Sequence, residues 1–146
     1  MNRSRRQLKN YSILVLILAG ITALNIIFEF FLKEINNVEI PEGSPQNILL
    51  TIKIVLAVMS FITLLPHIYI GIKGIGIANA PDSSKGHIIW GVILLAFTVA
   101  SLMHPVIALI KLEAVFANAA TLLSVALEAL IMFGYVRYAS LVSRGN

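Results

Sequence analysis

The chain has 146 residues, of which 58% are hydrophobic and only 12% are charged. Soluble domains carry about 25% charged residues, and here the deficit is concentrated in long apolar runs, so the composition indicates an all-α integral membrane protein. The chain contains no cysteine, which excludes disulfides, thiolate metal sites and cysteine catalysis. Its net charge of +4 does not indicate nucleic-acid binding, because the basic residues lie at the ends of the apolar runs.

The first apolar run covers residues 11–32 and follows a basic segment. A secretory signal peptide also begins with basic residues followed by an apolar run. However, this run of about 22 residues exceeds the roughly 7–15 residues of a signal core. We therefore expect a retained first membrane span.

A polar loop at residues 33–46 separates this run from a second predicted span at 48–72. A second loop is expected at residues 73–86, where Gly74 and Gly76 would unwind the end of the helix. The following turn offers three candidates for the N-cap of the next helix: Asp82, Ser83 and Ser84.

The third span is predicted at residues 87–110 and the fourth at 114–138, joined by a very short turn at 111–113. Spans of about 22–25 residues can cross a bilayer with some tilt. The short loops predict one domain, residues 1–146, folded as an up-down-up-down bundle of four transmembrane helices.

The distribution of Lys and Arg predicts the orientation of this bundle, because cytoplasmic loops are enriched in both. If both termini are cytoplasmic, the basic residues on that side outnumber those outside. The inner group is Arg3, Arg5, Arg6, Lys9, Lys73, Lys85, Arg137 and Arg144, and the outer group is Lys33, Lys53 and Lys111. We expect cytoplasmic N- and C-termini, and the Ile-, Asn- and Lys-rich composition favours a prokaryotic cytoplasmic membrane.

Each predicted span carries small and polar residues along one face. Such residues let membrane helices approach closely and hydrogen-bond to one another. In the fourth span the face consists of Ala114, Ala117, Asn118, Thr121, Ser124, Glu128 and Tyr135. We expect these faces to pack the bundle and to support assembly with further copies or other membrane subunits.

Several polar residues are expected near the outer side of the membrane. Glu29 and Lys53 fall at similar depth, so they are predicted to pair with each other or to extend towards the interface. Asn25, His104 and Asn118 lie near the same level. Together the five residues would form either a shallow cavity open to the outside or a satisfied cluster of hydrogen bonds.

Glu128 is expected near the bilayer midplane, where an ionised side chain is costly and usually has a partner or a task. His67 is predicted about 10 Å nearer to the cytoplasm and follows Pro66. Three roles for Glu128 remain open at this stage. It could be a neutral, hydrogen-bonded structural residue, part of an interface with another subunit, or a proton carrier with His67 as its relay.

The chain has three histidines, which raises the question of a haem. Two axial ligands must lie at matching depth, but His67 and His104 are expected to differ by about 17 Å, and His67 and His87 by about 8 Å. No metal-ligand spacing is present, and the single Asp, Asp82, lies in a loop, so no Ser-His-Asp triad is predicted. We expect no cofactor, no metal site and no catalytic residues.

Three hypotheses for function follow. The first is a non-enzymatic multi-pass protein that forms oligomers or serves as an accessory subunit of a membrane complex. This hypothesis predicts that Ala120→Leu or Ser124→Leu disturbs assembly more than Glu128→Gln does. The second is a proton-linked small-molecule transporter or channel protomer that uses Glu128 and His67. The third is a small lipid- or quinone-binding membrane enzyme built around His104. The expected partners are the lipid bilayer and other membrane subunits, without nucleic acid.

Overall fold

The computed structural model describes residues 3–31, 46–80 and 85–144. Within the helices, the side chains of residues 29–31, 46–50, 52, 53, 56, 57 and 60 lie outside this description. Most of the predicted 33–46 loop and the 81–84 turn with its three candidate N-caps also lie outside the described residues.

Every regular element in the described part of the chain is an α-helix. The helices are α1 (Arg3–Phe31), α2 (Gln46–Asn79), α3 (Gly86–Ser101), α4 (Met103–Ile110) and α5 (Val115–Arg144). Four segments are long and apolar enough to cross a membrane, with α3 and α4 together forming the third. The predicted all-α fold with four candidate membrane spans is confirmed.

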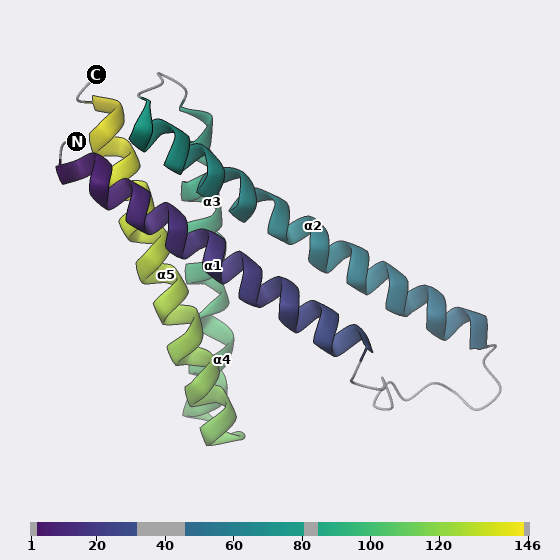
Figure 1. Ribbon diagram of the computed structural model, residues 1–146. Helices are drawn as coiled ribbons and strands as arrows, with labels where there is room; N and C mark the ends of the chain where they lie inside the picture. The colour runs from purple at the N-terminus through teal and green to yellow at the C-terminus, as the bar shows by residue number, and fades with distance from the viewer. Residues whose placement is uncertain (1–2, 32–45, 81–84, 145–146) are drawn as a thin grey trace.

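The helices form two groups that meet at one end of the molecule. In Figure 1, α1 and α2 lie side by side as a pair, while α3, α4 and α5 form a second group that diverges from this pair. The start of α1 and the end of α5 lie at the end where the groups meet. The buried core lies there as well, and it includes Leu8, Val15, Ile70, Ile77, Met132, Tyr135 and Val142.

Glycine and tyrosine allow the two groups to approach closely. A Cβ added at Gly74 would collide with Ser12 Oγ and lie 2.7 Å from Tyr135 Cε2, and one at Gly134 would collide with the ring of Tyr11. The buried Tyr135 hydroxyl donates a hydrogen bond of 3.0 Å to the carbonyl of Ile70. Small residues thus pack α1, α2 and α5 together, as membrane helices commonly do.

The prediction that Gly74 and Gly76 unwind α2 is wrong. The helix continues to Asn79, and the amide of Ala80 still donates to the carbonyl of Gly76 at 2.8 Å. Glycine weakens a helix only modestly, by roughly 1 kcal/mol. The close packing of Gly74 against α1 and α5 outweighs that cost.

The third span is interrupted where a single helix was expected. The chain turns at Leu102, whose amide donates to Val99 O at 3.2 Å, one residue closer than in an α-helix. Pro105 explains the interruption, because it has no amide to donate to the carbonyl of Ser101 and its ring crowds that carbonyl.

Candidate functional site

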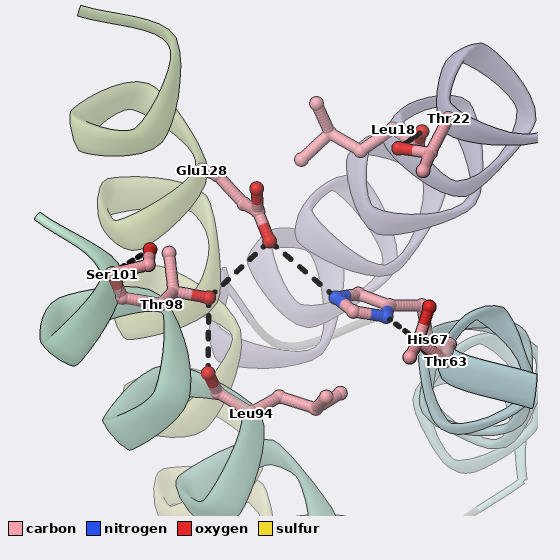
Figure 2. Close-up of polar contacts among 8 residues, drawn as sticks. All are labelled: Leu18, Thr22, Thr63, His67, Leu94, Thr98, Ser101 and Glu128. Atoms are coloured by element: carbon pink, nitrogen blue, oxygen red, sulfur yellow. Dashed lines mark hydrogen bonds and ion pairs between the residues drawn. The ribbon is translucent and has the colours of Figure 1, made fainter. Parts of the chain in front are cut away.

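An imidazole and a carboxylate from different helices meet between the two groups. Nε2 of His67, on α2, lies 3.5 Å from Oε1 of Glu128, on α5. Figure 2 shows the two side chains pointing towards each other, with Thr98 of α3 below Glu128 and with Leu18 and Thr22 of α1 above His67. The contact therefore links α2 to the second group of helices.

The second nitrogen of His67 determines where the protons of this pair must lie. Its Nδ1 is 3.2 Å from the backbone carbonyl of Thr63. A carbonyl oxygen only accepts, so Nδ1 carries a hydrogen and donates it. Nε2 and Oε1 of Glu128 then face each other and can share one proton, held either by the imidazole or by the carboxyl group. Without that proton, two acceptors would face each other.

Thr98 on α3 supplies a hydroxyl that can serve either form of Glu128. Its Oγ1 lies 3.0 Å from the carbonyl of Leu94 and 3.3 Å from Oε1 of Glu128. A hydroxyl has one hydrogen and two lone pairs. It can donate to Oε1 of Glu128 or to Leu94 O, and Oε1 keeps a lone pair for it whether or not the carboxyl group carries the proton that faces His67. The buried Thr98 can thus stay hydrogen-bonded to Glu128 in either protonation state of the carboxyl group.

The pair borders a cavity of about 300 Å³ between the two groups of helices. The side chain of Glu128 is 35% exposed and that of His67 is 18% exposed, so both are accessible from this cavity. The lining combines an aliphatic wall with hydroxyl and amide groups. It consists of Leu18, Ala19, Ile21, Thr22, Asn25, Thr63, Leu64, His67, Ser124 and Glu128.

Of the five other residues proposed from the sequence, one shares the cavity with the pair, two lie elsewhere and two have side chains outside the description. Asn25 lines the cavity together with Glu128. The Asn118 side chain donates a hydrogen bond of 2.6 Å to the carbonyl of Glu113 and so belongs to the turn before α5. His104 is exposed on α4 and is not part of the cavity lining. The side chains of Glu29 and Lys53 are outside the description, so their predicted pairing stays a prediction.

The direct contact between His67 and Glu128 differs from the depth separation expected from the sequence. That separation of about 10 Å assumes straight helices that run along the membrane normal. In the structure α2 crosses the second group obliquely (Figure 1), which brings its His67 to the level of Glu128. The sequence did not predict that the Thr63 carbonyl contacts His67 or that the Thr98 hydroxyl contacts Glu128, although both residues belong to the polar residues of their spans. Their contacts depend on helix rotation and tilt, which periodicity alone does not specify.

The fold and the site define an all-helical bundle that has four segments long and apolar enough to span a membrane and a carboxyl–imidazole pair at a cavity between its helices. No protein-family model, curated protein or solved structure matches the chain. Its function is therefore argued from the geometry of this site.

Proposed function

We propose that this protein is a protomer of a proton-linked small-molecule transporter or channel, in a membrane with both termini on the cytoplasmic side. The observation that carries the proposal is the contact of 3.5 Å between His67 and Glu128 at the edge of a cavity, where the two side chains can share one proton. Ionisable groups within membrane spans commonly serve proton or substrate pathways. The excess of Lys and Arg at the end of the termini supports the orientation.

Protonation of this pair provides a physical link to movement of the helices. With the proton in place, His67 and Glu128 attract each other and hold α2 against α5. When the proton leaves, two acceptor atoms face each other and that attraction is lost. The packing of the α1–α2 pair against the second group then depends on the protonation of the site. A proton-dependent change between two arrangements is what alternating access requires.

Proton flux into liposomes that contain the purified protein tests this proposal. An internal pH dye reports the flux, and wild type is compared with Glu128→Gln. We expect the substitution to abolish flux, because an amide cannot take up a proton at this position. Glu113→Gln is the matched control, since it removes the same charge from the exposed turn before α5. Equal flux in wild type and Glu128→Gln would contradict the proposal.

A second candidate, a non-enzymatic subunit that assembles with further copies, is supported by a different observation. The first half of α5 keeps part of its face of small and polar residues uncovered. Ala117, Thr121 and Ser124 are exposed, although such residues commonly lie where membrane helices pack together. A second copy could cover this face, and the two candidates are compatible, since a transporter or channel of small protomers would also assemble.

A further inference from the structure

We infer that the cavity beside Glu128 and His67 binds a small amphipathic ammonium ion in exchange for the proton that the pair holds. The inference rests on the proposed proton-linked function and adds the chemical class of its substrate. It follows from the charge, the hydrogen-bonding groups and the apolar wall of the site.

The charge of the pair specifies the charge of the ligand. With one proton between Nε2 of His67 and Oε1 of Glu128, the pair is neutral overall. Loss of that proton leaves a neutral imidazole beside a carboxylate. The site then carries a charge of −1 within a predicted membrane span. Among the residues whose side chains the structure describes, His67 and Glu128 are the titratable groups that line the cavity. From the same set, α1 contributes Leu18, Ala19, Ile21, Thr22 and Asn25, and α2 adds Thr63 and Leu64. From α3, the group that contacts Glu128 is the hydroxyl of Thr98. A ligand that replaces the proton must therefore bring one positive charge.

The positions of the acceptor atoms specify a cation that carries N–H groups. After the proton has left, Nε2 of His67 and Oε1 of Glu128 are two acceptors 3.5 Å apart. An ammonium nitrogen beside this edge can lie about 2.9 Å from both atoms at once and donate to each, which is ordinary hydrogen-bond geometry. A quaternary ammonium ion has no N–H and can satisfy neither acceptor.

The rest of the lining suits an apolar body of limited size. Leu18, Ile21 and Leu64 provide aliphatic surface opposite the polar pair. The Thr22 hydroxyl already donates to the carbonyl of Leu18 at 3.0 Å, so what it offers a ligand is a lone pair. The side-chain oxygens of Asn25 and Ser124 are further acceptors. A volume of about 300 Å³ is at the small end of ligand pockets.

The exchange conserves charge and requires no other reactant. The protonated pair and a primary ammonium ion, R–NH₃⁺, give the deprotonated pair with R–NH₃⁺ bound, and one proton leaves to the solvent. No covalent bond is made or broken apart from the N–H or O–H bond to that proton. Binding of each ammonium ion therefore releases one proton.

Calorimetry with butylammonium and the purified protein in detergent tests the inference, together with a pH indicator in weakly buffered solution. Wild type should bind butylammonium and release about one proton for each ion bound, because the pair holds one proton. Two probes of similar shape serve as ligand controls. Butyltrimethylammonium keeps the charge without N–H groups, and 1-butanol keeps the alkyl chain without the charge. Both should bind about ten-fold more weakly or worse, since hydrogen bonds to charged groups contribute strongly.

Variants then locate the site. Glu128→Gln should weaken butylammonium binding by about ten-fold or more and abolish proton release, whereas Glu113→Gln should change neither. The ligand controls on wild type keep the test valid if Glu128→Gln fails to fold.

The inference would be overturned if butyltrimethylammonium bound as tightly as butylammonium, or if Glu128→Gln left butylammonium binding unchanged. Glu128-dependent proton flux without butylammonium binding would overturn the substrate class and leave the proposed function intact. Binding with proton release, but without proton flux even when butylammonium is present on one side of the liposome membrane, would instead contradict the proposed function.

Discussion

Gly74 and Gly76 on α2 are only two residues apart but differ in their surroundings. A Cβ at Gly74 would collide with Ser12 Oγ, whereas one at Gly76 would meet nothing within 4 Å. Ser12 cannot easily move, because it is buried and its hydroxyl donates to Leu8 O at 2.8 Å. Of these two glycines, Gly74 is therefore the one that the approach of α1 to α2 requires.

We expect Gly74→Ala to lower the free energy of unfolding by about 1–3 kcal/mol, as overpacking of a tight core does. Gly76→Ala is the matched control and should be neutral or stabilising by up to about 1 kcal/mol, because alanine favours a helix. Titration of the purified variants with SDS, followed by loss of helix packing, measures both effects. Equal stability of the two variants would show that Gly74 does not limit the approach of the helices.

The candidate site could be predicted in part from single residues. Glu128 and His67 stand out in the sequence because ionisable side chains in a membrane span are costly and need a reason. Their contact could not be predicted, since a contact at 3.5 Å requires a particular crossing of α2 and α5. The role of Thr63 is harder still to foresee, because its backbone carbonyl, and not its side chain, orients the imidazole.

At the scale of the elements, the turn between α4 and α5 carries identifiable strain. Leu112 has a φ of 58°. Its amide donates to Leu109 O at 3.0 Å and the amide of Glu113 donates to Ala108 O at 2.9 Å. These two hydrogen bonds form a Schellman motif, in which the residue with positive φ is usually glycine. Here it is leucine, for which this conformation costs roughly 1–2 kcal/mol.

We expect Leu112→Gly to stabilise the protein by up to about 1 kcal/mol, because relief of this strain exceeds the entropy that glycine adds to the unfolded chain. Little contact is lost, since Leu112 is 79% exposed. Leu112→Ala is the control, because it removes the side chain beyond Cβ and keeps the strain. The melting temperature in detergent measures both variants, and a Leu112→Gly protein no more stable than Leu112→Ala would contradict the prediction.

The helices themselves follow from the sequence better than their ends do. Long apolar runs predict spans because backbone amides within a bilayer must be satisfied internally. The ends depend on local competition between forces. Close packing carries α2 past Gly74 to Asn79, while Pro105 interrupts the third span although its apolar run continues. Apolar content alone does not distinguish these two cases.

At the scale of the molecule, the divergence of the two helix groups was not predictable. In water, an apolar face must be buried against another, which restricts how helices pack. In a bilayer, bulky apolar side chains can face lipid as well as protein. Leu24, Phe97 and Phe116 are all exposed in the structure and are compatible with lipid contact. The sequence therefore predicts an all-helical bundle and leaves the angle between its groups open.

The uncovered face of α5 leads to a prediction about assembly. If a second copy packs there, Ala117→Leu should weaken self-association about ten-fold or more, because a bulky residue prevents the close approach that small residues permit. Ala119→Leu is the matched control: it is exposed on the same helix about 160° away, among bulky residues. Analytical ultracentrifugation in detergent measures the mass of both variants beside wild type. A mass equal to the monomer in wild type, or equal loss in both variants, would contradict assembly through this face. If Ala117→Leu lost both self-association and Glu128-dependent proton flux, then assembly would be required for the proton-linked function.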